Sequence, residues 1–316
     1  MTVPDVVDVH VHFVRSQQQE KLVFPKAGWP DEWYGANPEG LDRWLRSEEL
    51  AHIFAINFID THSIIDNRLA RMTADERPAA EKELAAQMTE RTASFNDWIT
   101  DYCKTESRVT PFINIDIGAF YGDQQAMMDN LEKNIANGAK GVKIHPGLSR
   151  FFPNDERMWP VYERLQSAGL PVLSDSGSAG GRTPGSTVYG EPVNFIPVFE
   201  KFPRLKFIMA HLTTAYWDHR IDIAKRFPEI RYDISGGFYQ PDGPMRARDA
   251  NRCVPLADAA RFLKTIGTDR CMFGTDAPGA DVRAYIRVIL GLDLTDGEKE
   301  QILGKNAREF VGLPKA

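Results

Sequence analysis

Short runs of β-branched and aliphatic residues alternate along the chain with longer segments in which apolar positions recur at helical spacing. Eight of these runs have the length of buried strands. The expected strands cover residues 6–13, 53–60, 109–116, 139–146, 170–177, 206–212, 230–236 and 271–278. Strands that alternate with helical segments in this way predict βα units around a parallel sheet.

The segments that follow the strands predict the helices that cover the sheet. These helices are expected at residues 39–51, 74–105, 123–137, 155–168, 191–202, 216–227, 256–266 and 281–290. A ninth helix is expected at the end of the chain, because Thr295 and Glu298 have the spacing of a capping box ahead of a periodic apolar run.

Eight strands, each followed by a helix, predict an α/β fold of the (β/α)8 or TIM-barrel type. We expect a single domain over residues 1–316, with long insertions after the first strand (14–38) and after the second (61–108). An open doubly wound sheet is the main alternative, but it usually carries a GxGxxG turn after its first strand. The glycine-rich run at 177–185 lacks the GK[ST] ending of a phosphate loop, so we interpret it as a mobile active-site loop.

Composition narrows the class of protein. The 316 residues are 42% hydrophobic and 26% charged, which is enough to bury a large core. A net charge of −6 argues against nucleic acid as a partner, and no apolar run approaches the ~18 residues of a membrane-spanning helix. The three cysteines have no paired spacing, and the first residues lack the features of a signal peptide. We therefore expect a cytoplasmic protein without disulfides or a thiolate metal site.

Ionisable side chains gather where the expected strands end, which is where barrel enzymes build their sites. Because side chains alternate along a strand, the two histidines of the first strand share one face. A single histidine at a strand end is most often structural, but the whole set at barrel spacing predicts a metal centre. Imidazole and carboxylate groups together suit Zn²⁺, Mn²⁺ or Fe²⁺, and zinc is the default for a site without thiolates. In chain order, the set is His10, His12, Lys143, His145, Asp175, His211 and Asp276.

The sequence resembles the amidohydrolase superfamily, in the amidohydrolase-related branch (amidohydrolase 2) that also contains aminocarboxymuconate-semialdehyde decarboxylase. The resemblance covers nearly the whole chain and rests on DVHVHF, GAKGVKIHP, FPRLKFIMAHL, FGTDAP and the ending ILGKNAREFVGL. It implies that His10 and His12 bind one divalent metal ion and that Asp276 binds the metal or takes a proton from its water. It also implies that His211 is a ligand or a polarising and proton-transferring group beside the substrate.

One position departs from the family pattern. Where relatives commonly read PVLIHTG, this chain reads PVLSDSG, so Asp175 stands at the position of a metal-binding histidine. A carboxylate can also coordinate a metal, and we expect Asp175 to be a ligand of a retained metal ion. An oxygen-rich site of this kind raises the odds of manganese against zinc. In the alternative, Asp175 acts as a second base and metal binding is weakened or lost.

Five further residues are expected to bind the substrate. Arg150 and Arg182 lie in the loops after the fourth and fifth strands, where either could hold a substrate carboxylate in a bidentate fork. His62 follows the second strand, and Lys143 and His145 end the fourth. In some branches of the superfamily, a carbamylated lysine of the fourth strand bridges two metal ions, but the resemblance to this branch implies no such role for Lys143. A structural or solvated role is the alternative for each of the five.

These features predict a metal-dependent hydrolase that acts on a small amide, ester or lactone, including carboxylated compounds derived from aromatic rings. Metal-activated water would attack while Asp276 accepts a proton and His211 polarises the carbonyl group or protonates the leaving group. The alternative enzyme is a metal-dependent nonoxidative decarboxylase of the same branch, and a third hypothesis is a metal-free, non-catalytic barrel. No membrane partner is expected. Relatives are often dimers, and the enlarged second crossover offers an interface for a homodimer.

Overall fold

The computed structural model describes residues 5–25, 34–177, 186–213, 215–236, 238–239, 253–278 and 281–314. The main sheet has eight parallel strands in the order β1-β2-β3-β4-β5-β6-β7-β10. Its strands are β1 (Val6–Val11), β2 (Leu50–Ile56), β3 (Val109–Asn114), β4 (Gly141–Ile144), β5 (Val172–Ser174), β6 (Phe207–Met209), β7 (Arg231–Asp233) and β10 (Cys271–Met272). Val11 bridges in parallel to Ala277, beyond the end of β10, so the last strand returns to the first. This is the (β/α)8 barrel that the apolar pattern predicts.

Helices follow the strands at the expected places. They include α2 (Leu41–Glu48), α4 (Arg77–Tyr102), α5 (Gln124–Ala136), α7 (Trp159–Ala168), α8 (Ile196–Lys201), α9 (Trp217–Arg226), α10 (Leu256–Ile266) and α11 (Val282–Gly291). The predicted capping box of Thr295 and Glu298 is present and begins α12 (Asp296–Glu300), which is followed by α13 (Asn306–Val311) near the end of the described residues. No helix within the described ranges is both long and apolar enough to cross a membrane.

Two segments for which the apolar pattern predicts no helix are helical. The insertion after β1 contains α1 (Gln17–Val23), which begins at Ser16, whose side chain accepts a hydrogen bond from the Gln19 N–H. The segment after β2 contains α3 (Thr61–Leu69), where Asp60 caps the helix in the same way. Both caps are visible in the sequence, but the helices are too short to show a clear apolar period.

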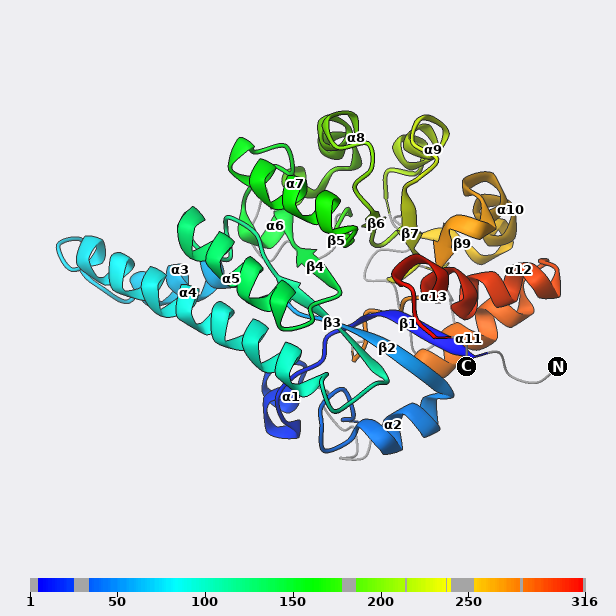
Figure 1. Cartoon of the computed structure of the whole chain (residues 1–316), viewed down its shortest axis with the longest axis horizontal. Coiled ribbons are helices and arrows are strands. Elements are labelled where there is room, and N and C mark those ends of the chain that lie inside the picture. The colour runs from blue at the N-terminus through cyan, green and yellow to red at the C-terminus, as the bar shows by residue number, and fades with distance from the viewer. Residues whose placement is uncertain are drawn as a thin grey trace. The chain divides into compact units, whose positions relative to one another are not determined.

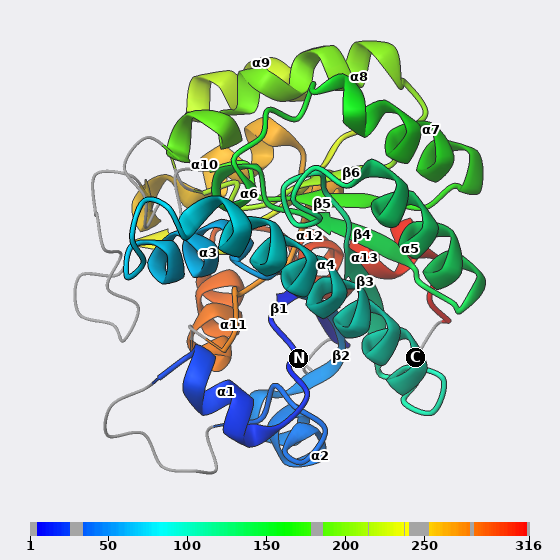
Figure 2. The same cartoon turned by 90° about the vertical axis from the view of Figure 1, so that its left-hand side faces the viewer.

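The described chain divides into two compact units. The first comprises Met1–Asn57, Glu106–Thr110 and Ile208–Ala316, and the second comprises Phe58–Thr105 and Pro111–Phe207. In the second unit, the long helix α4 packs between α3 and α5 (Figures 1 and 2). The expectation of a single domain stays a prediction.

The end of the chain is fitted closely to β1 within the first unit. A side chain at Gly304 would clash with the carbonyl oxygen of Asp5, just before β1. The Phe273 N–H donates to the carbonyl oxygen of Ile302 at 2.8 Å. The closing helical segment therefore supports the strand that carries the histidine pair and the segment after β10.

Candidate metal centre

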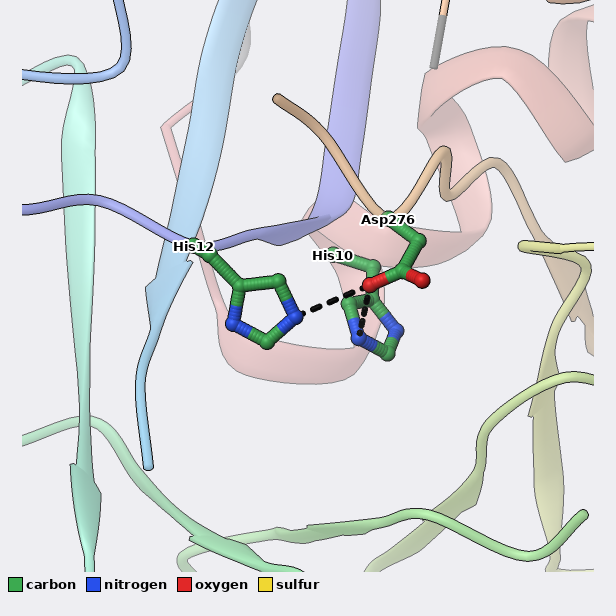
Figure 3. A group of neighbouring side chains, drawn as sticks. All are labelled: His10, His12 and Asp276. Carbon is green, nitrogen blue, oxygen red and sulfur yellow. Dashed lines mark hydrogen bonds and ion pairs between the residues drawn. The ribbon is translucent and has the colours of Figure 1, made fainter. Parts of the chain in front are cut away.

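Three of the predicted metal ligands meet at the carboxyl end of β1. Ligand atoms of His10, His12 and Asp276 all lie within 4.8 Å of one another. Asp276 Oδ1 lies 2.8 Å from His12 Nε2 and 3.4 Å from His10 Nε2, and Figure 3 shows this oxygen facing a nitrogen of each ring. The imidazoles are buried, whereas the Asp276 side chain is 41% exposed. The cluster thus brings two ring nitrogen atoms and one carboxylate oxygen to face one another.

Backbone contacts between β1 and the segment after β10 bring these residues together. The Val9 N–H donates to the carbonyl oxygen of Phe273 at 2.9 Å, and the His12 N–H donates to that of Ala277 at 2.7 Å. Asp276 has a left-handed backbone conformation with φ of 64°. This conformation is uncommon outside glycine and is maintained only where the surroundings fix it. The backbone of the fold therefore determines where the Asp276 carboxylate lies.

Asp8 holds β1 and the segment after β10 together. Its Oδ1 atom accepts hydrogen bonds from the His10 N–H at 2.9 Å and the Thr275 N–H at 3.2 Å. Its Oδ2 atom accepts the Thr275 hydroxyl hydrogen at 2.5 Å. Complete burial raises the pKa of Asp8 to about 8 and outweighs these hydrogen bonds, which act in the opposite direction.

Asp233, at the end of β7, contacts Nδ1 of the His10 ring, the nitrogen that does not face Asp276. His10 Nδ1 donates a hydrogen bond to Asp233 Oδ2, and both side chains are buried. The proton on Nδ1 leaves the lone pair on Nε2, the nitrogen that faces Asp276. Metal-binding histidines are typically held by a carboxylate in this way. The donor set of the cluster therefore fits a divalent cation.

A glycine makes room for this carboxylate. A side chain at Gly274, in the FGTDAP segment, would clash with Asp233 Oδ1 and would approach the Cβ atom of His10. Asp233 could then no longer keep its place beside the His10 ring. The glycine two residues before Asp276 thus has a steric reason to be there.

The surroundings of Asp276 favour its ionised form. Loss of surrounding water opposes ionisation, but the hydrogen bond from His12 and the positive charge that His10, His12 and His211 carry when protonated together outweigh it. A bound cation would supply the same positive charge beside neutral rings. The pKa of Asp276 therefore lies well below its usual value. An ionised carboxylate is the form that binds a cation or accepts a proton.

His211, just after β6, lies beside the cluster. Its ring centroid is 4.9 Å from that of His10, and its Nδ1 atom lies 3.0 Å from Ser235 Oγ. The backbone of His211 is left-handed, with φ of 62°, and the next N–H, of Leu212, donates to the Asp233 carbonyl oxygen at 2.8 Å. These contacts fix the ring near His10, while its catalytic role stays a prediction.

Asp175 and His145 belong to the second unit, where they face each other. Asp175 Oδ2 lies 3.7 Å from His145 Nε2, and both side chains are buried. His145 Nδ1 accepts a hydrogen bond from the Leu148 N–H at 3.3 Å, which caps the short helix α6 (Pro146–Ser149). His145 thus stabilises the chain at the end of β4. The assignments of Asp175 as a metal ligand and of His145 to the substrate stay predictions.

The other expected substrate-binding residues are placed as follows. Lys143 is buried on β4. Arg150 forms an ion pair with Asp66 of α3, and it lines a pocket of about 210 Å³ together with His62. Burial lowers the pKa of His62. Arg182 lies outside the described residues. The assignment of these residues to substrate binding stays a prediction.

Sequence reasoning missed the residues that hold the cluster. Asp233 ends the seventh strand, so the test that selected the other strand ends applies to it as well. Asp8 precedes His10 by two residues and shares its face of the strand. Ser235 offers no comparable signal, because a serine in a turn after a strand is common.

Comparisons with known proteins agree with this fold. No curated protein matches the sequence. A TIM-barrel protein from Bordetella bronchiseptica has 16% sequence identity and a TM-score of 0.67, with 98% of each chain covered. A dihydroxybenzoic acid decarboxylase from a Polaromonas species, with bound manganese and the inhibitor 2-nitroresorcinol, has 16% identity and a TM-score of 0.67 over 99% of this chain and 98% of that chain. The 4-oxalomesaconate hydratase from Rhodopseudomonas palustris has 15% identity and a TM-score of 0.61 over 98% of this chain and 96% of that chain.

The sequence itself matches one family model. The match, to the family described as amidohydrolase, covers residues 7–313 and therefore includes the histidine pair, Asp276 and the closing helices. It agrees with the resemblance inferred from the strand-end motifs. This chain belongs to the amidohydrolase family.

Proposed function

We propose that this protein is a divalent-metal-dependent hydrolase of small organic substrates, namely amides, esters or lactones, including carboxylated compounds derived from aromatic rings. One observation carries the proposal: the Nε2 atoms of His10 and His12 face the same ionised carboxylate oxygen of Asp276. Two imidazole nitrogens and a carboxylate suit zinc, which we propose first, and also manganese or iron. Asp175 is proposed as an additional oxygen ligand.

The side chains around the cluster support hydrolysis in separate ways. A cation held by His10, His12 and Asp276 would lower the pKa of water and polarise a substrate oxygen. Asp233 keeps the His10 ring in the orientation and tautomer that cation binding requires. Asp276, being ionised, accepts the proton that the attacking water loses, and His211 donates to the substrate carbonyl group or leaving group.

A nonoxidative decarboxylase is the second candidate. The fold likeness to the manganese-bound dihydroxybenzoic acid decarboxylase supports it, because that protein is named for a reaction of a small aromatic acid. In such a reaction His211 would supply the proton that replaces the departing carboxyl group. The same three ligands serve both reactions, so the products must separate them.

Metal analysis and product analysis test these proposals together. The protein is purified without chelator, its metal content is measured, and a panel of carboxylated aromatics and lactones is assayed for acid release and for CO₂ release. Acid release without CO₂ supports the hydrolase, and CO₂ release supports the decarboxylase. A chain that binds no transition metal and turns over no substrate after addition of zinc or manganese would contradict both, in favour of a non-catalytic barrel.

A further inference from the structure

Ser235 lies between two histidines of the candidate site. Its hydroxyl oxygen lies 3.1 Å from His10 Nδ1 and 3.0 Å from His211 Nδ1, and the residue is fully buried. Its N–H donates to Asp233 Oδ1 at 2.6 Å, which fixes the serine beside the carboxylate. A single hydroxyl group therefore connects the His10 ring with the His211 ring.

The hydroxyl hydrogen cannot go to His10. Asp233 Oδ2 faces His10 Nδ1, and Asp233 Oδ1 accepts the Ser235 N–H. With Asp233 ionised, both of its oxygens act only as acceptors, and His10 Nδ1 then carries the proton. A protonated ring nitrogen has no lone pair to offer the serine. Ser235 Oγ can accept from His10 but cannot donate to it.

His211 Nδ1 is then the acceptor that is left. The contacts of the Ser235 hydroxyl group found within the described ranges are these two ring nitrogens. A buried hydroxyl hydrogen without an acceptor is unfavourable, because the group has lost its water. We propose that Ser235 donates to His211 Nδ1 and thereby sets the His211 tautomer, with the ring proton on Nε2. A neutral imidazole has one N–H and one lone pair, so occupation of the Nδ1 lone pair places the proton on the other nitrogen.

The backbone around His211 keeps this hydrogen bond in place. The Leu212 N–H donates to the Asp233 carbonyl oxygen at 2.8 Å, and Thr213 Oγ1 donates to that of Ile234 at 3.1 Å. The segment that carries His211 is thus held along the segment that carries Ser235. Ser235 is a positioning residue that makes His211 a donor at Nε2 rather than a base. The consequence for catalysis rests on the proposed function, whereas the tautomer does not.

Nitrogen NMR of histidine-labelled protein tests the tautomer directly. The full chain is labelled with ¹⁵N in its histidine rings and studied metal-free and zinc-loaded, at a pH where the rings are neutral. The His211→Gln variant identifies the signals of His211 by their loss. We expect an unprotonated Nδ1 and a protonated Nε2 in the wild type and in Ser235→Thr, which keeps the hydroxyl group. Ser235→Ala should shift both His211 signals toward a mixture of the two tautomers.

Two results would overturn the proposal. One is a protonated Nδ1 of His211 in the wild type, and the other is an unchanged His211 tautomer in a folded Ser235→Ala variant. A thermal melt of each variant shows that it is folded. The NMR readout needs no substrate, so a failure of the proposed function would not change its result. Conversely, a different His211 tautomer would refute this proposal without bearing on metal binding or hydrolysis.

Discussion

Two buried histidine sites of the first unit differ in what surrounds the ring. At the carboxyl end of β1, His10 and His12 face the Asp276 carboxylate, and Asp233 holds the other side of His10. Near the start of β2, His52 Nε2 lies 2.7 Å from the hydroxyl oxygen of Thr110, which is uncharged. All three rings are at least nine-tenths buried. Burial therefore does not separate a candidate metal-binding imidazole from a structural one; the position along the strand and the charge of the partner do.

The largest expected effect concerns the histidine pair. Replacement of both His10 and His12 by Ala removes two of the three convergent donor atoms, so we expect the bound metal to fall from about one equivalent per chain to background. His52→Gln is the matched control and should keep its metal. Elemental analysis of equal amounts of folded protein makes the comparison. Retention of metal by the double variant would show that the ligands lie elsewhere.

The next effect concerns Asp276 and the chemical step. Asp276→Asn keeps the shape of the side chain but removes its charge and its capacity to accept a proton. We expect turnover to fall by roughly 10²- to 10⁴-fold, the usual contribution of a general base. The assay uses metal in excess, so that weaker binding does not limit the rate. Full turnover with metal bound would exclude Asp276 as the proton acceptor, and His52→Gln should retain the wild-type rate.

A smaller effect on metal binding is expected for Asp233, which acts on the metal only through His10. Asp233→Asn retains a hydrogen-bond acceptor for His10 Nδ1 but loses the carboxylate, so we expect metal affinity to weaken by roughly 10- to 100-fold. Competition with a chelator of known affinity measures this change. Asp222→Asn, at an exposed position on α9, is the control and should not change the affinity. An unchanged affinity in Asp233→Asn would mean that the carboxylate does not support the ligand.

The fold could be predicted from the sequence because the barrel repeats one local pattern. Each apolar run is long enough to identify a buried strand, and the strand order follows the chain. The short helices α1 and α3 were beyond this method, because each depends on a single cap and on tertiary contacts rather than on a long apolar period. Their caps, Ser16 and Asp60, are the only local signals that the sequence offers for them.

The candidate site divides in the same way. The alternation along β1 brought His10 and His12 to one face, and the strand-end rule selected Asp276, so the cluster itself was predictable. The support from Asp233 and Ser235 depends on side chains that meet across strands distant in sequence. The positions of strand ends predict which residues lie in one region, but they do not predict which ring nitrogen contacts which oxygen.

The smallest expected effect concerns His52 and appears only with pH. Burial lowers the pKa of His52 from 6.5 to about 4, and the nearby charge of Arg308 acts in the same direction. Between these two values the unfolded chain binds a proton that the folded chain does not. The stability from the neutral ring is therefore fully present above pH 6.5 and is lost as the pH falls toward 4.

We expect the His52 ring to lower the free energy of unfolding of the wild type by on the order of 2 kcal/mol when the pH falls from about 7.5 to 5. His52→Gln has no titrating group at this position, so its loss over the same interval should be smaller by that amount, whatever the substitution costs at neutral pH. Urea unfolding at the two pH values measures both losses. Equal losses in wild type and His52→Gln would mean that the ring near Thr110 is protonated as readily in the folded chain as in the unfolded one. The interpretation of His52 as a neutral, structural histidine, in contrast to His10 and His12, would then be wrong.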